Sequence, residues 1–466
     1  MSTQNKSEKK GQTYLLAGNG FDIALGLKTK YSDFFMVVGI IIALDVYQTY
    51  NIKDYNFSDV KGGKKSVTEQ VEMIFKDFND SNYFEYLGEF RSERIDKEYY
   101  KEITEIALNY YISSDYDAIK DFRSSLKSSF CFDFIEKIFP DLASYLKEDP
   151  LDYKIFYKYE WLFIRTGSEQ NLADYDVAKL SNYEYLPRFI QILNDCIKKS
   201  VYMNWMDLES FIELLVTGNE YLESKFNIRQ NRKYLHNQHS MALDYSSGLE
   251  KFCLIFEKYI SLINKDIPDK YNVNDITKPY KKSFQERNIN EDVSLLDLFN
   301  VDAIFSYNYS NTFCKLFPDL SKNDSIYYIN GKVLGDFDSI RTESKIVFGY
   351  TRDNKNIDVS PKCLIFEKDK QRFLKNIKMH PYDQIFNKEN FNIVIFGHSC
   401  SPADGDVFRS ILNSPKLEKA VICCYDKDSM TSAYENLVKV LDDSPSSNTT
   451  INDLIINKKV LFCLNE

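Results

Sequence analysis

Short, continuous apolar runs occur near the N-terminus and throughout the last third of the chain. Runs of this kind, bounded by polar residues, are typical of strands that are buried on both faces of a sheet. They lie at 14–17, 302–308, 325–330, 345–350, 392–398, 419–425 and 459–464. Since helix-length segments separate most of them, they predict a parallel sheet covered by helices on both sides.

A different pattern fills the middle of the chain, from about residue 45 to 290. Apolar residues three and four positions apart, as on one face of a helix, recur at 65–78, 185–205 and 249–264. The fold class that accounts for both patterns is α/β, with a Rossmann-like parallel sheet core that is split by a large α-helical insertion.

This interpretation divides the chain into four parts. They are a disordered leader over 1–12, the first strand, loop and helix of the core over 13–44, a mainly helical insertion over 45–293 and the remainder of the core over 294–466. The leader is polar, and the apolar run that follows it at 14–17 is too short for the apolar core of a signal peptide, so the leader does not resemble one.

The most apolar stretch of the chain is FFMVVGIIIAL at 34–44. A membrane-spanning helix needs about 20 apolar residues, and this stretch is shorter and lies between Asp33 and Asp45. The pattern therefore predicts a buried core helix and no membrane partner.

Composition and charge narrow the class of protein further. The 466 residues carry a net charge of −10 without a basic block, so we expect no nucleic-acid partner. Nine cysteines at irregular spacings, in a chain without a secretory signal, indicate reduced thiols in a cytoplasmic protein.

The turn Gly18-Asn19-Gly20 links the first apolar run to residues with helical spacing. If it joins a strand to a helix, its backbone N–H groups and the helix N-terminus attract an anion, and glycines let a phosphate or ribose come close. The dinucleotide-binding fingerprint is incomplete, because Ile23 stands where its third glycine belongs. Asn-Gly is also a strong hairpin signal. From the residues alone, both interpretations stay open.

Two later polar residues have both a structural and a functional interpretation. His398 follows an apolar run, at a strand end where ligand-facing residues gather in open α/β sheets, and it is also consistent with a satisfied polar group near the core. Asn330 precedes Gly331, and this pair is also consistent with a simple turn.

The helical middle offers weaker candidates. Asp207 and Glu209, beside Trp205, are two positions apart, so on a helix they point to different faces and do not form an acid–base pair. His236 and His239 share a helical face, but we identify no further ligands and predict no metal site.

The stretch GNGFDIALGLKTKYSDF at 18–34 resembles the opening signature of the AbiH family of bacterial abortive-infection proteins. Four further segments resemble later motifs of that family, in the same order along the chain. They are NWMDLESF at 204–211, FSYNYSNTF at 305–313, IVFGY at 346–350 and IVIFGHSCSPAD at 393–404.

The same elements look like a distant version of the sirtuin-type NAD⁺ fold. This resemblance implies that the Gly-x-Gly loop binds the cofactor and that an Asn at a strand end contacts the nicotinamide ribose. The residues that it implies for cofactor binding are Gly18, Asn19, Gly20, Phe21, Asp22, Thr29, Tyr31 and Ser399. The catalytic candidates are Asn308, Asn330 and His398.

The resemblance implies an antiphage effector that binds NAD⁺ and hydrolyses it to nicotinamide and ADP-ribose. The sirtuin pattern has a histidine as general base where this chain has Asn330, and an amide cannot act as a base near neutral pH. The alternatives are a sensor or scaffold that binds NAD⁺ or ADP-ribose without turnover, and a toxin directed at nucleic acid. A nucleotide is the expected ligand, and a phage-derived activator or a second copy of the chain is compatible with such an effector.

Overall fold

The computed structural model describes about half of the chain. The described residues are 11–54, 102–103, 105–107, 109–110, 116–127, 238–265, 267, 280, 300–333, 344–350, 366–377, 381–442 and 449–465. Of the sequence candidates, Trp205, Asp207, Glu209 and His236 lie outside these residues, as does the side chain of His239. The predicted bounds of the helical insertion fall largely outside them too and stay a prediction.

The chain forms two compact units. One consists of Met1–Lys30 together with Trp205–Glu466, and it contains the sheet. The other is Tyr31–Asn204. Its described helices are α2 (Tyr31–Asp54) and α6 (Tyr116–Lys127).

The sheet has six parallel strands in the order β3-β2-β1-β4-β5-β6. The strands are β1 (Gln12–Ala17), β2 (Ala303–Ser306), β3 (Ile326–Tyr328), β4 (Phe391–Phe396), β5 (Leu417–Cys424) and β6 (Val460–Leu464). This is the strand order of the doubly wound Rossmann fold, so the α/β prediction is confirmed. The N-terminal strand lies in the middle, between two strands that follow it by hundreds of residues.

Register places the ends of the central strands at one level. Ala17, the last residue of β1, is the partner of Ser306 in β2 and of Phe396 in β4. Because the strands are parallel, the segments that follow all three emerge at the same carboxyl edge of the sheet. Leu15 and Leu16 point to opposite faces and both are fully buried, which explains why this strand is a continuous apolar run.

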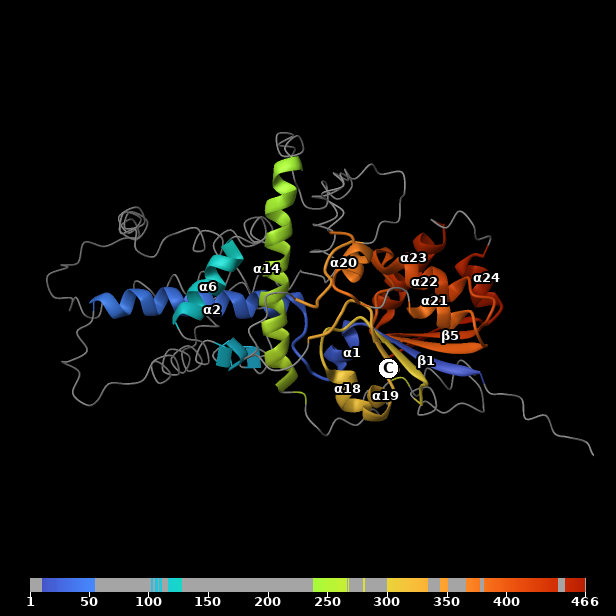
Figure 1. Ribbon diagram of the computed structural model, residues 1–466. Helices are drawn as coiled ribbons and strands as arrows, with labels where there is room; N and C mark the ends of the chain where they lie inside the picture. The colour runs from blue at the N-terminus through green and yellow to red at the C-terminus, as the bar shows by residue number, and fades with distance from the viewer. Residues whose placement is uncertain are drawn as a thin grey trace, which may run out of the picture. The chain divides into compact units, whose positions relative to one another are not determined.

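Helices follow most strands and pack around the sheet (Figure 1). In the first unit they are α1 (Asn19–Ala24), α14 (Gln238–Lys265), α18 (Thr312–Leu316), α19 (Pro318–Lys322), α20 (Lys368–Leu374), α21 (Pro381–Phe386), the 3-10 turn η7 (Pro402–Asp404), α22 (Gly405–Leu412), α23 (Lys427–Asp442) and α24 (Ile451–Ile456). The helix expected after Gly20 is α1. Gly26, just beyond its end, has a φ of 81°, a left-handed conformation that glycine adopts without strain.

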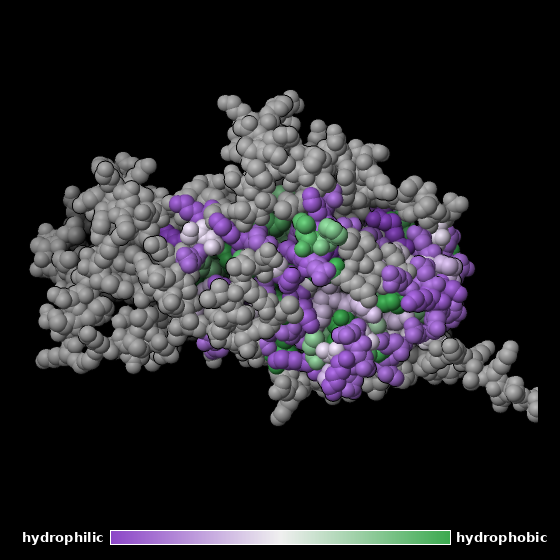
Figure 2. Space-filling view, viewed as in Figure 1, coloured by the Kyte–Doolittle hydropathy of each residue, from purple (hydrophilic) through white to green (hydrophobic). Residues whose placement is uncertain are grey.

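The apolar stretch 34–44 lies in α2, and its residues up to Ile42 are buried, as predicted for a core helix. Among the described helices, none has the length and apolar character to cross a membrane. Hydrophilic residues cover most of the described surface that Figure 2 shows, with small apolar patches between them.

The strand predicted at 345–350 is wrong. This segment is buried and extended, but it makes only an isolated bridge, between Tyr350 and Glu367. A side chain replaces a neighbouring strand: Gln371 of α20 accepts from the Phe348 N–H (3.0 Å) and donates to the Phe348 carbonyl (2.6 Å). An apolar run therefore indicated burial correctly but not sheet pairing.

We predict that Gln371→Leu destabilises the protein by about 2–4 kcal/mol, because it removes two buried hydrogen bonds to the backbone. Denaturant unfolding measures the change. Phe373→Ala is the matched control on the same helix, since that side chain is exposed and should change stability by less than about 0.5 kcal/mol. Equal stability of Q371L and F373A would contradict the role assigned to Gln371.

Candidate functional site

The loop after β1 packs directly on the loop after β4. The Gly18 N–H donates to the Phe396 carbonyl (3.0 Å), and the Gly20 N–H donates to the Gly397 carbonyl (2.8 Å). A Cβ atom at Gly20 would lie 2.6 Å from the Gly397 Cα, which is too close for any larger residue. The glycines thus allow two backbones to touch at the point where the strand order reverses.

This arrangement is neither of the two that the residues alone left open. A helix follows the turn, so it is not a hairpin. It also differs from a simple anion cradle, because the N–H groups of Gly18 and Gly20 already donate to the carbonyls of Phe396 and Gly397. Cofactor binding by the loop stays a prediction, and any such contact must come from its other groups.

A small pocket lies beside this loop, at the carboxyl ends of β1 and β2. Its empty volume is about 210 Å³ when the space open to solvent is included, and the space free of protein atoms within it has room for about one water molecule, so a ligand as large as a dinucleotide would have to lie mostly outside it. Its lining residues are Asn19, Asp22, Thr29, Ile260, Tyr307, Asn308, Tyr309 and Ser310. The fold has therefore brought together four residues that the sequence predicted from segments far apart: Asn19, Asp22, Thr29 and Asn308.

Two residues of the pocket are buried with unused hydrogen-bonding atoms. The Asn308 residue is 3% exposed, and within the described residues neither its Nδ2 nor its Oδ1 has a partner. The Asp22 residue is 1% exposed, and its Oδ1 also has no partner there. Since buried polar groups are nearly always hydrogen-bonded, these atoms mark a place where a ligand or water belongs.

The other carboxylate oxygen of Asp22 is held firmly. Ser310 Oγ donates to Asp22 Oδ2 (2.6 Å), and Ser310 Oγ lies 2.8 Å from Thr312 Oγ1. Burial raises the pKa of Asp22 to about 6, and hydrogen bonding from Ser310 and Thr312 offsets part of the increase. Asn308 lies near enough to lower this pKa as well, although its amide makes no hydrogen bond of ordinary geometry.

Neighbouring contacts fix the shape of the pocket. Thr29 Oγ1 donates to Asn19 Oδ1 (2.6 Å) and Asn19 Nδ2 donates to the Thr29 carbonyl (3.2 Å), which ties the residues after α1 back to the loop. On the opposite wall, Asn264 of α14 accepts from the Asn311 N–H (2.8 Å). This bond holds the segment after β2 to the helix that supplies Ile260.

Five predicted cofactor residues do not line this pocket: Gly18 and Gly20, which pack on the loop after β4, and Phe21, Tyr31 and Ser399. Phe21 is fully buried, and its ring lies 4.7 Å from that of Phe313 and 5.5 Å from that of Phe396, centre to centre. Ser399 is exposed, and its carbonyl accepts from Asn436. Tyr31 is buried and belongs to the other unit.

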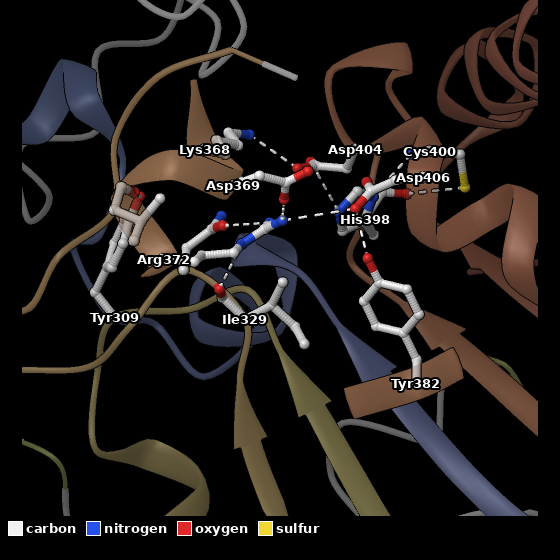
Figure 3. A network of polar contacts seen from close by, with 12 residues as sticks. Tyr309, Ile329, Lys368, Asp369, Arg372, Tyr382, His398, Cys400, Asp404 and Asp406 are labelled. Atoms are coloured by element: carbon white, nitrogen blue, oxygen red, sulfur yellow. Dashed lines mark hydrogen bonds and ion pairs between the residues drawn. The ribbon is translucent and has the colours of Figure 1, made fainter. Parts of the chain in front are cut away.

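His398 lies in a second polar cluster, drawn in Figure 3. Its Nδ1 accepts from the Cys400 N–H (2.9 Å), so the proton is on Nε2, which lies 3.4 Å from Asp404 Oδ2. Both ring nitrogens are engaged within the protein. This geometry favours the interpretation of His398 as a satisfied polar group over that of a free base.

Asn330 belongs to the same cluster and not to the pocket. Its Oδ1 accepts from Arg372 (3.1 Å), whose Nε donates to the Ile329 carbonyl (3.1 Å). The Arg372 guanidinium also donates to Asp369 (2.8 Å) and lies 3.6 Å from Asp406 (Figure 3). Asn330 therefore helps to satisfy a buried cation.

Lys368, one helical turn before Arg372, is equally buried and donates to Asp404 (2.8 Å). Burial alone would raise the pKa of Asp404, but the Lys368 charge and hydrogen bonds from His398 and Lys368 hold this pKa well below its usual range. The sequence did not single out this ion pair, because Lys-x-x-x-Arg on a polar helix looks like an exposed face.

Tyr307 connects the two clusters. It is one of the residues that line the pocket, and its ring packs edge-to-face on His398 with 4.7 Å between ring centres. Burial, together with the charges of Asp404 and Asp406, raises its pKa well above the usual value, so the phenol stays protonated. Its hydroxyl has no partner within the described residues.

The fold and the pocket define the class of protein. It is a Rossmann-like α/β protein with a buried polar pocket at the carboxyl edge of its sheet, and no cluster of three or more metal-ligating side chains occurs in the described part. A family model described as "Bacteriophage abortive infection AbiH" matches residues 14–426, so the chain belongs to this family of phage abortive-infection proteins. Comparison with curated proteins and with solved structures gives no match.

We predict that Asp22→Asn changes the free energy of unfolding more favourably at pH 8 than at pH 4.5, with wild type at the same pH as the reference. The raised pKa means that Asp22 contributes most below about pH 4 and that this contribution is lost as pH rises through about 6. A shift of about two pKa units corresponds to about 3 kcal/mol. Denaturant unfolding of both proteins at both pH values measures the difference, and a difference independent of pH would contradict the burial of an ionisable Asp22.

The buried ion pair between Lys368 and Asp404 predicts a substitution that destabilises the protein. Lys368→Met should destabilise the protein by about 3–5 kcal/mol at pH 7, because it leaves the buried Asp404 carboxylate without its cation. Adding Asp404→Asn removes that charge and should recover much of the loss. Chemical denaturation of both variants is the measurement, and a double variant less stable than K368M would contradict this account.

Proposed function

We propose that this AbiH protein acts in abortive infection by binding NAD⁺ at the carboxyl-edge pocket and hydrolysing it to nicotinamide and ADP-ribose. The observation that carries the proposal is Asn308: a buried amide, directly after a central strand, with its donor and its acceptor both unused. In a Rossmann-like fold the carboxyl edge is where nucleotides bind. The resemblance to the sirtuin-type fold assigns the nicotinamide ribose to an Asn at a strand end, and Asn308 has that place.

The pocket suits the sugar better than the diphosphate. Its unused groups are the amide of Asn308 and one carboxylate oxygen of Asp22, which together can donate to and accept from ribose hydroxyls. A carboxylate repels phosphate, and the amides of Gly18 and Gly20 are already bonded to β4. The diphosphate would therefore lie outside this pocket.

The chemistry requires little more than such a pocket. Breaking the N-glycosidic bond places positive charge on the ribose and releases neutral nicotinamide. An enclosed site that holds the ribose, limits bulk water and places negative charge nearby favours this step. Asp22 supplies that charge when it is ionised.

A second candidate function is binding of NAD⁺ or ADP-ribose without turnover. It is favoured by the state of the two candidates for completing the catalytic site. Asn330, at the position of the sirtuin base, is bonded to Arg372, and both nitrogens of the strand-end residue His398 are engaged. No observation on the described residues favours a toxin directed at nucleic acid.

We predict that purified protein releases nicotinamide from NAD⁺ and that Asn308→Ala lowers the rate at least about 100-fold, because a buried contact to the reacting ribose is lost. Free nicotinamide is quantified over time by chromatography. Asn392→Ala is the matched control, since this amide lies at the opposite, amino end of β4 and bonds only weakly to Glu418.

The outcomes separate the candidates. Binding of NAD⁺ by calorimetry without nicotinamide release would support the sensor. Neither binding nor release, with NAD⁺ levels also unchanged in phage-infected cells that express the protein, would contradict both. Equal rates for N308A and N392A would remove the role of Asn308.

A further inference from the structure

We infer that Asp22 is the catalytic base of the proposed hydrolysis, taking the place of the histidine that this chain lacks. The inference rests on the proposed function. It starts from the unused Oδ1 of a carboxylate whose other oxygen is fixed, in the same pocket as the unused amide of Asn308.

The hydrogen bonds around Asp22 give the carboxylate a defined orientation. Ser310 donates its hydroxyl proton to Asp22 Oδ2, and the Ser310 hydroxyl lies 2.8 Å from that of Thr312. This two-hydroxyl chain runs from the segment after β2 into α18 and occupies one oxygen. The other oxygen, Oδ1, is buried and has no hydrogen-bond partner within the described residues, and Asp22 is one of the residues that line the pocket.

No other pocket residue can accept a proton near neutral pH. Tyr307 keeps its phenolic proton because burial raises its pKa well above the usual value. Tyr309 donates its hydroxyl proton to the Val347 carbonyl (2.9 Å). The remaining lining side chains are amides, hydroxyls and an isoleucine. His398 and Asn330 do not line the pocket and are bonded elsewhere.

The environment also keeps Asp22 in a useful protonation range. A base is most effective when its pKa lies near the working pH, and Asp22 titrates at about 6 because of its burial. The groups facing it are Ser310 and Thr312 from the α18 side, Asn308 from the end of β2 and Tyr328 from β3. Only Tyr328 among them is titratable, and it stays neutral because burial raises its pKa.

The step balances as follows. A water oxygen bonds to C1′ of the nicotinamide ribose while the C1′–N bond breaks, and its electron pair leaves with neutral nicotinamide. One water proton passes to Asp22 Oδ1, and the hydroxyl remains on ADP-ribose. Asp22 then releases the proton to solvent, so NAD⁺ and water give nicotinamide, ADP-ribose and one proton.

The test is the pH profile of nicotinamide release by wild type, Asp22→Asn and Asp22→Glu. For wild type, kcat should rise with pH and level off above an apparent pKa of about 6. D22N should lose about 10²–10⁴-fold in kcat with an NAD⁺ dissociation constant changed by less than about threefold, and its profile should be flat. D22E should keep part of the activity, and its kcat should still rise with pH before it levels off; this rising part of the curve is the pH-dependent limb.

Two further variants make the result specific. Ser310→Ala removes a hydrogen bond that lowers the pKa of Asp22, so the limb should move to higher pH while activity at high pH persists. Asp302→Asn is the matched control: its carboxylate accepts from the Thr13 N–H at the amino edge of the same sheet, and its profile should match wild type.

Each failure has a distinct meaning. A D22N rate within about threefold of wild type, or a loss confined to NAD⁺ affinity, overturns the role of Asp22 and leaves NAD⁺ hydrolysis intact. An unshifted limb in S310A overturns the assignment of that limb to Asp22. Absence of nicotinamide release by wild type overturns the proposed function, and this inference with it.

Discussion

The contact between the loops after β1 and β4 is the constraint on which the rest of the core depends. A Cβ atom on Gly397 would lie 2.4 Å from the backbone of Gly20 and of Phe21, so the two backbones touch with no side chain between them. Gly397 has a φ of 62°, which only glycine adopts at little cost. The contact fixes where α1 begins, and hence where Asp22 points. It also engages the N–H groups of Gly18 and Gly20, which in a Rossmann-type site would face the ligand.

The pocket lies one strand to the side of this contact, at the ends of β1 and β2. The two polar clusters at this edge differ in their energetics. In the cluster of Lys368, Arg372 and Asp404, each charge has a partner, and this arrangement holds α20 against the strand ends. In the pocket, Asp22 and Asn308 keep unused atoms that cost stability. Such a cost is expected where a protein binds a ligand rather than where it only packs.

Tyr307 is where the two clusters meet, since it packs on His398 and also lines the pocket. The ion-paired cluster thus lies directly behind one residue of the pocket wall. This explains why His398 and Asn330, although they follow strands at the ligand-binding edge, are bonded to the protein itself. A position at the end of a strand is therefore not enough to make a polar residue part of the pocket.

The sequence by itself determined the class of fold, because strands buried on both faces must be continuously apolar and the helices between them must be long enough to cross over. It also identified Asn19, Asp22, Thr29 and Asn308, through the motifs in which they stand. Only the tertiary structure decided that the 345–350 segment bonds to Gln371 instead of a strand. It alone showed that the glycines bring two backbones together and that Lys368 and Arg372 are buried. The reason is the same in each case: a side chain's partner lies far away in the sequence, and local pattern carries no information about it.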